Sequence, residues 1–238
     1  MSSAASSRQQ ILERVRAATP SAAPAATQLA EAYAALPRAY RRQGAMSAEQ
    51  RLALMIERLR EYDAEVVECA PAELVSAIAA QLAASGKHTF VAPAGLPAAW
   101  LVPGFDWKID CNLPAGEIEK AEGVVTAAFL GVAESGTIVL HHSVAEGRRV
   151  LTLLPDWHLC ILRASQVVET LPEYFARCEQ APVLVTWISG PSATADIEMT
   201  RIKGVHGPRF LHVILIRDEV RGEARDEVGD ETAQATLN

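Results

Sequence analysis

The sequence predicts an α/β protein of three layers, α/β/α, built on a mostly parallel sheet. Three continuous apolar runs, at 137–140, 183–188 and 210–216, support this prediction, because such runs are typical of strands buried on both faces of a parallel sheet. Half of the residues are apolar and only 5% are aromatic, which suits an α/β domain with alanine-rich helices. With 238 residues, the chain is long enough for one large domain with a single core.

The net charge and the distribution of apolar residues argue against several classes of function. The net charge of −7 argues against nucleic acid as a main partner. No apolar run approaches the ~20 residues that a membrane helix needs, so no membrane span is predicted. The polar segment 2–10 lacks the apolar core of a secretory signal, and we therefore expect a cytoplasmic protein.

The four cysteines indicate neither a metal cofactor nor a disulfide framework. They are widely spaced and form no Cys-x-x-Cys pair, so they match neither a zinc site nor an iron–sulfur motif. A reducing compartment and a chain without a cofactor of its own are the simplest interpretation. The four positions are Cys69, Cys111, Cys160 and Cys178.

Residues 1–46 are predicted to form a helical arm and a linker. An amphipathic helix is expected at 8–18, after which Pro20 and Pro24 interrupt the chain. A second helix is expected at 28–36. A basic cluster follows, for which a solvated linker is the simpler interpretation: Arg38, Arg41 and Arg42.

The α/β domain is predicted to span 47–218. Ser47 and Gln50 have the spacing of a capping box, and apolar residues recur behind them at the spacing of one helix face. The polar tail at 219–238 shows no periodicity and is expected to be disordered.

The elements inside this domain begin with a strand, a helix and a strand. The strands are expected at 65–69 and 88–92, and this order predicts a parallel pair with a right-handed crossover. The helix between them begins near Pro71 and is closed by Gly86. Further strands are expected at 123–127, 130–133 and 158–162, and helical segments at 117–122 and at 167–178, where Pro172 can break the helix.

The segment 93–116 is rich in proline and carries three aromatic residues. Trp100, Phe105 and Trp107 either form a lid over a site or anchor a long loop to the core. Anchoring is the commoner use of aromatic residues in such a loop.

Glu134 is the most suggestive single residue for catalysis. It lies between apolar residues and the turn Ser135-Gly136-Thr137, directly before a buried strand. A carboxylate in that position is expected to be partly desolvated unless backbone N–H groups hold it, and such a group suits a nucleophile or a general base. The three turn residues are candidates for substrate binding. The alternative is that Glu134 hydrogen-bonds neighbouring loops and fixes the end of a sheet.

The loop that begins at Gly190 is the best candidate for binding an anion. Gly190 and Pro191 follow a strand, and Ser192 and Thr194 add hydroxyls beside free backbone N–H groups. Two nearby carboxylates, on Asp196 and Glu198, would repel an anion unless they face away or are paired. A plain turn is an equally good interpretation.

His206 is a second catalytic candidate, because the flanking Gly204 and Gly207 place it on a loop. A structural histidine that bonds a carbonyl is the alternative. A metal site made of His141, His158 and His206 is conceivable, but nothing in their spacing requires it, and no metal is predicted.

The three loops that carry Glu134, Gly190 and His206 each adjoin an apolar strand. Because parallel strands deliver their loops to a common edge, we expect the three loops to converge at one edge of a single sheet.

Four ordered motifs give the chain a specific resemblance. They are Ala133-Glu134-Ser135-Gly136-Thr137, Leu153-Leu154-Pro155-Asp156-Trp157-His158, the segment from Gly190-Pro191-Ser192 to Glu198, and Gly204-Val205-His206-Gly207-Pro208. With these motifs the segment 47–218 resembles the lactate-utilisation protein C family, part of the larger LUD-domain group. The resemblance implies an α/β/α fold of the NagB/RpiA/CoA-transferase-like type. It also implies a role in oxidising L-lactate to pyruvate beside partner proteins that carry iron–sulfur clusters.

Two functions are consistent with this resemblance. The first is a non-cluster component of an iron–sulfur L-lactate oxidation system, with a small-carboxylate or partner-binding site around Glu134, Ser192 and His206. The second is a stand-alone acyl- or CoA-transferase-like enzyme that uses Glu134 as nucleophile or base. Class I CoA-transferases carry a Ser-Glu-Asn-Gly segment, of which this chain keeps the glutamate and the glycine but neither neighbour. A purely structural subunit with a docking surface is a third interpretation.

Overall fold

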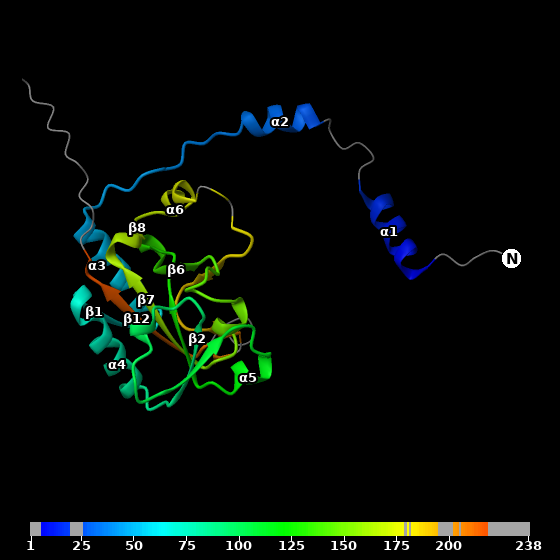
Figure 1. Cartoon of the computed structure of the whole chain (residues 1–238). Helices are drawn as coiled ribbons and strands as arrows, with labels where there is room; N and C mark the ends of the chain where they lie inside the picture. The colour runs from blue at the N-terminus through cyan, green and yellow to red at the C-terminus, as the bar shows by residue number, and fades with distance from the viewer. Residues whose placement is uncertain are drawn as a thin grey trace, which may run out of the picture. The chain divides into compact units, whose positions relative to one another are not determined.

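The computed structural model of the chain describes residues 6–19, 26–178, 180, 182–194, 202–204 and 206–218 (Figure 1). It divides into two compact units, Met1–Tyr40 and Arg41–Asn238. The predictions for Asp196 and Glu198, and for the tail from 219, lie outside the described residues.

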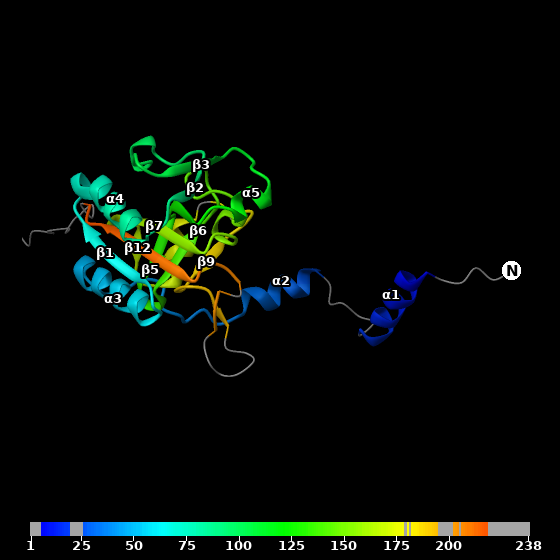
Figure 2. The same cartoon turned by 90° about the horizontal axis from the view of Figure 1, so that it is seen from below.

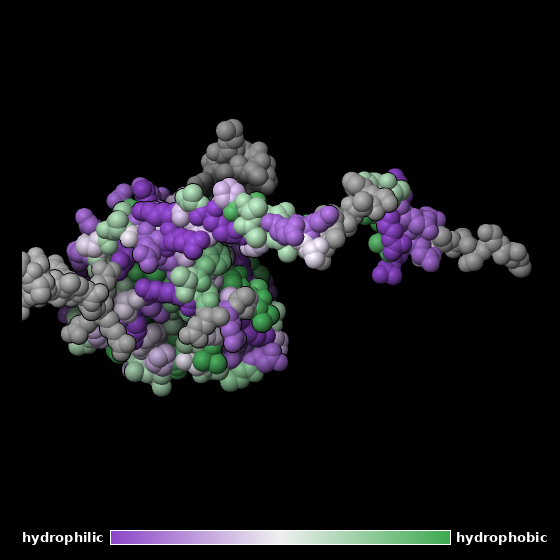
Figure 3. Space-filling view, turned by 90° about the horizontal axis from the view of Figure 1, so that it is seen from above, coloured by the Kyte–Doolittle hydropathy of each residue, from purple (hydrophilic) through white to green (hydrophobic). Residues whose placement is uncertain are grey.

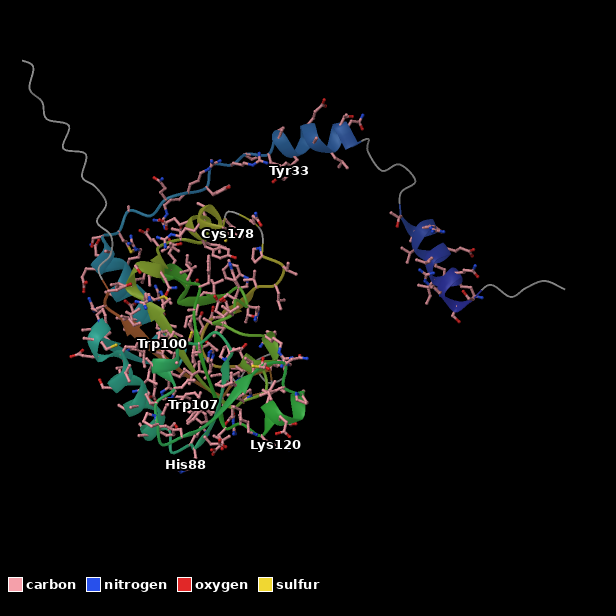
Figure 4. The ribbon with its side chains drawn as sticks, in the orientation of Figure 1. Tyr33, His88, Trp100, Trp107, Lys120 and Cys178 are labelled. Carbon is pink, nitrogen blue, oxygen red and sulfur yellow. The ribbon has the colours of Figure 1, made fainter. Side chains whose placement is uncertain are left out.

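The first unit contains the two helices expected from the sequence, α1 (Ser7–Ala18) and α2 (Ala26–Ala34). A capping box in which Ser6 and Gln9 bond each other's backbone N–H begins α1. None of the residues of α1 is buried, and its apolar stripe is exposed to solvent. In α2, Tyr33 is also exposed (labelled in Figure 4).

The second unit is built on a six-stranded sheet in the order β1-β12-β7-β4-β2-β3. All five pairings in it are parallel, which confirms the predicted fold class. In the order of the sheet, the strands are β1 (Glu65–Cys69), β12 (Phe210–Ile216), β7 (Trp157–Arg163), β4 (Gly123–Ala127), β2 (Thr89–Pro93) and β3 (Asp106–Asp110).

Helices cover both faces of this sheet, α3 (Ala48–Glu61) on one and α4 (Leu74–Ala84) on the other (Figure 2). Alternate residues of β12 show the two sides, since Val213 packs in the core cluster of α3 and Ile214 in that of α4. The predicted capping box begins α3: the Gln50 N–H donates to Ser47 Oγ at 3.2 Å and Gln50 Oε1 accepts from the Ser47 N–H at 2.9 Å.

A second sheet of four short strands packs beside α3, in the order β8-β5-β6-β9. Its pairings β5/β6 and β6/β9 are antiparallel, and β5/β8 is parallel. One outer layer of the domain is therefore part helix and part sheet. The strands are β5 (Leu130–Val132), β6 (Thr137–Leu140), β8 (Val167–Val168) and β9 (Thr186–Ile188). A two-stranded antiparallel ribbon joins β10 (Ala193–Thr194) to β11 (Ile202–Lys203).

Two of the three apolar runs do not lie in the parallel sheet, contrary to the prediction. The run 137–140 is buried as β6 of the small sheet, where both of its neighbours are antiparallel. Only three residues of 183–188 form a strand, and Val183 is fully exposed. The run 210–216 forms β12, flanked on both sides by parallel partners, as expected.

Two further local predictions were wrong. The strands β1 and β2 belong to one parallel sheet but do not pair, because β12, β7 and β4 lie between them. The segment 167–178 begins as β8 rather than as a helix, and α6 (Leu171–Arg177) starts only afterwards. Pro172 lies in the first turn of α6, where its missing N–H costs no hydrogen bond. The predicted turn near 117–122 is α5 (Ala115–Glu119).

The aromatic residues of 93–116 anchor this segment to the core rather than cover a site. Trp100 is buried, and Phe105 and Trp107 pack against Phe90 at ring-centroid distances of 5.5 and 5.7 Å (Trp100 and Trp107 in Figure 4). The indole N–H of Trp107 donates to the Val102 carbonyl at 2.9 Å. In the described part of the chain, no helix is long and apolar enough to cross a membrane.

Candidate functional site

A pocket of about 230 Å³ opens where the small sheet meets the loops at the start of β12 and β7. One wall is the segment 186–193, formed by β9 and the loop after it. A second wall consists of residues 206–208, before β12. Leu211 and three polar residues, Arg149, Thr152 and His158, complete the lining, and we call the whole the Arg149 pocket.

Ser192 joins the two walls of the pocket. Its N–H donates to the Pro208 carbonyl at 2.9 Å, and its hydroxyl accepts from the N–H of His206 at 3.0 Å. The N–H of Gly204 donates to the Ser192 carbonyl at 2.9 Å. The Gly190 and His206 loops therefore lie together. They adjoin strands of two different sheets, β9 of the small sheet and β12 of the parallel sheet, and Glu134 does not line the same pocket, so the prediction that all three loops converge at one edge of a single sheet was wrong.

Gly190 is required by its backbone and by its surroundings. Its φ is +81°, a conformation that side chains disfavour. A Cβ at this position would lie 2.5 Å from the Cβ of Tyr62. The glycine thus lets the loop turn tightly against the end of α3 before it forms the pocket wall.

Arg149 gives the pocket its positive charge. The residue opens a 3₁₀ turn, Arg149–Thr152, and its Nη1 donates to the Thr152 carbonyl at 3.0 Å and to the Thr152 hydroxyl at 3.3 Å. Among the residues that the structure describes, no carboxylate pairs with it, and burial lowers its pKa. A partly buried guanidinium without a counter-charge is a natural binding site for an anion, because its remaining N–H groups lack partners of matching strength.

His158 lies on β7 and is 1% exposed. Its Nε2 is 2.8 Å from the hydroxyl of Thr126, which itself lies 3.8 Å from the sulfur of Cys160. Burial, with a smaller effect from the charge of Arg149, lowers the pKa of His158 to about 3. The ring is therefore neutral at physiological pH.

The carboxylate of Glu134 does not line the pocket. Glu134 lies in a 3₁₀ turn, Ala133–Ser135, and forms an ion pair with Arg41. Arg41 also donates to Glu169 at 2.7 Å, and the buried carboxylate of Glu169 accepts the N–H of Met46 at 2.7 Å. We call this group of four residues the Glu134 corner.

Hydroxyl groups connect the Glu134 turn to the pocket wall. The Ser135 and Thr137 hydroxyls are 2.7 Å apart, and Thr137 lies 2.7 Å from the hydroxyl of Ser189, a pocket residue. Gly136 has a φ of +58°, and a Cβ there would lie 2.6 Å from Arg58 Cβ in α3. The turn therefore packs closely on α3 while its hydroxyls face the small sheet.

The remaining predicted site residues also divide into those that line the pocket and those that do not. Gly190, Pro191, Ser192, His206 and Gly207 all line the pocket, whereas Ser135, Gly136 and Thr137 do not. Thr194 lies in β10, next to the pocket residue Ala193.

Two of the three histidines considered for a metal, His141 and His158, are held by other partners. His141 lies outside the pocket, where its Nε2 is 2.9 Å from the Tyr174 hydroxyl and its ring stacks on Phe129 at 3.7 Å. His158 bonds Thr126 as described above. Within the described ranges, no group of three His, Cys, Asp or Glu side chains is arranged to hold a metal ion.

Arg149 and Thr152 are site residues that the sequence did not reveal. The pair Arg148-Arg149 reads as a polar turn, and nothing local separates the two arginines. In the structure Arg148 bonds the buried carboxylate of Asp110 at 2.6 and 2.8 Å, while Arg149 turns into the pocket. The different roles of the two arginines therefore depend on Asp110, which is far away in the sequence.

Comparisons with known proteins agree with this picture of the domain. The family model described as LUD domain matches residues 115–216, which include every residue of the Arg149 pocket. The chain is 40% identical over 164 residues to the lactate utilization protein C of Deinococcus radiodurans, covering 67% of this chain and 76% of that one.

Further relatives extend the match to other bacteria and to a solved structure. The chain is 35% identical over 122 residues to the lactate utilization protein C of Bacillus subtilis, which covers 47% of this chain and 50% of that protein. The crystal structure of a DUF162 family protein from Deinococcus radiodurans has a TM-score of 0.60 at 35% identity. The match covers 72% of this chain and 99% of that one.

Proposed function

This chain belongs to the lactate utilization protein C family of LUD-domain proteins, and on that premise we propose that it serves lactate utilisation by binding a small carboxylate in the Arg149 pocket. In this proposal it is the non-cluster component of an iron–sulfur system that oxidises L-lactate to pyruvate. The names of its relatives support the pathway, and the pocket supports the kind of ligand.

The observation that carries the proposal is the free guanidinium of Arg149. Thr152 satisfies Nη1, and in the described part of the chain no carboxylate neutralises the charge. A carboxylate would supply the missing counter-charge in a planar, two-point geometry that matches arginine. At about 230 Å³ the pocket is smaller than the ~300–1,000 Å³ usual for drug-sized ligands, which suits an acid of a few carbon atoms.

The iron–sulfur partners are the second part of the proposal. Apolar side chains on α6 and around β9 offer a surface for such a partner, since Phe175 is 61% exposed and Trp187 is 43% exposed. Figure 3 shows hydrophobic side chains among hydrophilic ones on one face of the molecule. This surface lies beside the pocket, because Trp187 belongs to both.

The alternative proposal is an acyl- or CoA-transferase-like enzyme with Glu134 as nucleophile or base. Its carboxylate is paired with Arg41 and lies outside the pocket, so it would have to release Arg41 before attacking a thioester. The free charge of Arg149 favours the binding of a small acid over this alternative.

The test is calorimetric binding of L-lactate to the purified full chain and to Arg149→Gln. We expect the substitution to weaken binding by roughly 10–100-fold, because a charged hydrogen bond contributes about 1.5–3 kcal/mol. The matched control is Arg163→Gln, which removes the same charge at the other end of β7 from His158. Unchanged affinity in a folded Arg149→Gln protein would rule out the pocket as the carboxylate site. Lactate oxidation with added cluster-bearing proteins tests the partner role separately.

A further inference from the structure

Thr186 and His142 form a hydroxyl–imidazole pair at the wall of the Arg149 pocket. The hydroxyl of Thr186 lies 2.8 Å from Nε2 of His142, and Nδ1 of the same ring lies 2.8 Å from the carbonyl oxygen of Gly147. A carbonyl oxygen can only accept a hydrogen bond, so Nδ1 carries the ring hydrogen. In the neutral ring Nε2 is therefore the acceptor, and it receives the proton of the Thr186 hydroxyl.

The strand β9 presents this hydroxyl to the pocket. Thr186 and Ile188 point to the same face of β9, because alternate side chains of a strand do so. Ile188 packs against the core cluster of α3, so this face is turned towards the interior of the domain, and both residues line the Arg149 pocket. Among the described residues that line this pocket, His142 is absent, and the pocket therefore contacts the pair through Thr186.

The backbone holds His142 and its acceptor in place. His142 has a φ of +57°, a left-handed conformation that few residues other than glycine adopt. Gly147 has a φ of +75°, and a Cβ there would lie 2.5 Å from Leu151 Cδ1 and 2.9 Å from Pro93 Cγ. Its N–H donates to the Ser143 carbonyl at 2.8 Å. The carbonyl that orients the ring thus belongs to a tightly packed turn, and residues held in such conformations cluster at functional sites.

This arrangement is the one that activates a hydroxyl nucleophile. It requires a base within hydrogen-bond reach of the hydroxyl and a third group that orients the base. Thr186, His142 and the Gly147 carbonyl match these three parts in that order. The guanidinium of Arg149, which has no carboxylate partner in the described part of the chain, lines the same pocket and can stabilise negative charge that develops on a carbonyl oxygen under attack.

Going beyond the proposed function, we infer that the Arg149 pocket hydrolyses esters or thioesters of small acids, with Thr186 as nucleophile and His142 as general base. The volume of about 230 Å³ limits the acyl group to a few carbon atoms. The acid that hydrolysis releases is a small carboxylate, which is the class of ligand proposed for this pocket.

The reaction has two balanced steps. In the first, Thr186 Oγ1 forms a bond to the carbonyl carbon and its proton passes to His142 Nε2; the bond to the alcohol or thiol then breaks, and that group leaves with the proton. In the second, water attacks the acyl carbon and gives a proton to His142 Nε2. The bond to Thr186 breaks, its oxygen takes that proton, and the free acid leaves.

The first test is hydrolysis of p-nitrophenyl acetate by the purified full chain. Thr186→Val keeps the shape of the side chain, and we expect it to lower kcat/KM by roughly 10²-fold or more, the scale typical of a lost acid–base pair. Thr186→Ser retains a hydroxyl and should stay within about tenfold of the unaltered chain. The matched control is Thr89→Val at the start of β2, which should leave the rate unchanged.

The second test separates the base from the backbone. His142→Asn removes the imidazole, but asparagine tolerates the left-handed conformation, so the turn should remain folded while kcat/KM falls by roughly 10²-fold or more. Thermal unfolding of each variant checks the fold.

Mass spectrometry after an acid quench locates the acyl group without any substitution. We expect the acetyl group on Thr186. Hydrolysis at the same rate in the unaltered chain and in folded Thr186→Val, or an acetyl group found instead on the exposed thiol of Cys111, would overturn the inference. Calorimetric binding of L-lactate tests the proposed function separately, so either one can fail without the other.

Discussion

The Glu134 corner and the Arg149 pocket use charged residues in opposite ways. In the corner Arg41 lies between the carboxylates of Glu134 and Glu169, and the buried carboxylate of Glu169 also receives a backbone N–H. In the pocket, the guanidinium of Arg149 bonds two oxygen atoms of Thr152 and, within the described ranges, no carboxylate. The charges of the corner are paired with one another, whereas the charge of Arg149 has no carboxylate partner in the described part of the chain.

Among the described residues, the charge in the most distinctive motif is thus paired within the protein, whereas the charge in a plain turn is not. Glu134 stands in the most recognisable motif of the chain, yet its charge ties the segment that begins at Arg41 to the domain. Arg149 stands in an unremarkable turn, yet its charge faces a pocket. A ligand binds an unpaired charge more easily than a paired one, because the ion pair must first be broken.

The largest effect that distinguishes the two regions is expected on the free energy of unfolding, when a buried charge of the Glu134 corner is removed. Glu169→Gln should lower the free energy of unfolding by about 2–3 kcal/mol, since the 1%-exposed carboxylate loses the charge that holds Arg41 and the N–H of Met46. The affinity for L-lactate should change by less than twofold. Urea unfolding and calorimetry on the same protein measure both quantities. The control is Glu57→Gln, an exposed carboxylate, and a large loss of affinity in Glu169→Gln would remove the distinction between the regions.

The pocket should also make the protein sensitive to mild acid. His158 has a pKa of about 3 when folded and 6.5 as its ordinary value, so between these two values the unfolded chain binds a proton that the folded chain does not. Stability should therefore fall as the pH drops below 6.5, by about 2 kcal/mol at pH 5. The lowered pKa values of His141 and His212 act in the same direction.

Thermal and urea unfolding at pH 7 and pH 5 measure this loss of stability. A folded His158→Phe variant should lose distinctly less stability between the two pH values. An equal loss in that variant would assign the acid sensitivity to other groups.

A smaller effect is expected where the two walls of the pocket meet. Ser192→Ala removes the hydroxyl that accepts from the N–H of His206, so the two loops lose one of their connections. We expect L-lactate to bind about three- to tenfold more weakly, in line with roughly 1 kcal/mol for one hydrogen bond. Ser76→Ala on α4 is the matched control, because its hydroxyl bonds a backbone carbonyl far from the pocket in sequence. No change in affinity would mean that the loops are held by their backbone bonds alone.

The smallest effect is expected for Glu134→Gln. The side chains of Glu134 and Arg41 are 45% and 50% exposed, and an ion pair of that kind contributes about 0–1 kcal/mol. The affinity for L-lactate and the rate of reconstituted lactate oxidation should change by less than twofold. A fall of roughly 10²-fold in a stably folded protein would instead support Glu134 as a catalytic residue.

The parts of the fold that the sequence predicted are those set by local pattern. The capping box at Ser47, the apolar face of α3 and the strand at 210–216 follow from spacing alone, and the structure contains all three. The placement of 137–140 could not be predicted, because a strand buried in the parallel sheet and a strand buried in a small antiparallel sheet show the same apolar run.

The candidate site was predictable to a similar extent. The Gly190 and His206 loops were expected to meet, and Ser192 joins them. The separate roles of Arg148 and Arg149 could not be predicted, since they depend on the distant Asp110. The contact of His158 with Thr126 likewise joins two different strands.

Trp187 gives the chain an optical probe at the Arg149 pocket. Of the four tryptophans, Trp100 and Trp157 are buried and Trp107 packs against Phe90, whereas Trp187 is 43% exposed and lines the Arg149 pocket. An acid that enters the pocket displaces water from around that indole and so alters its emission, while the other three indoles keep their surroundings. Intrinsic fluorescence can therefore report occupancy of the pocket in solution without any added dye or label.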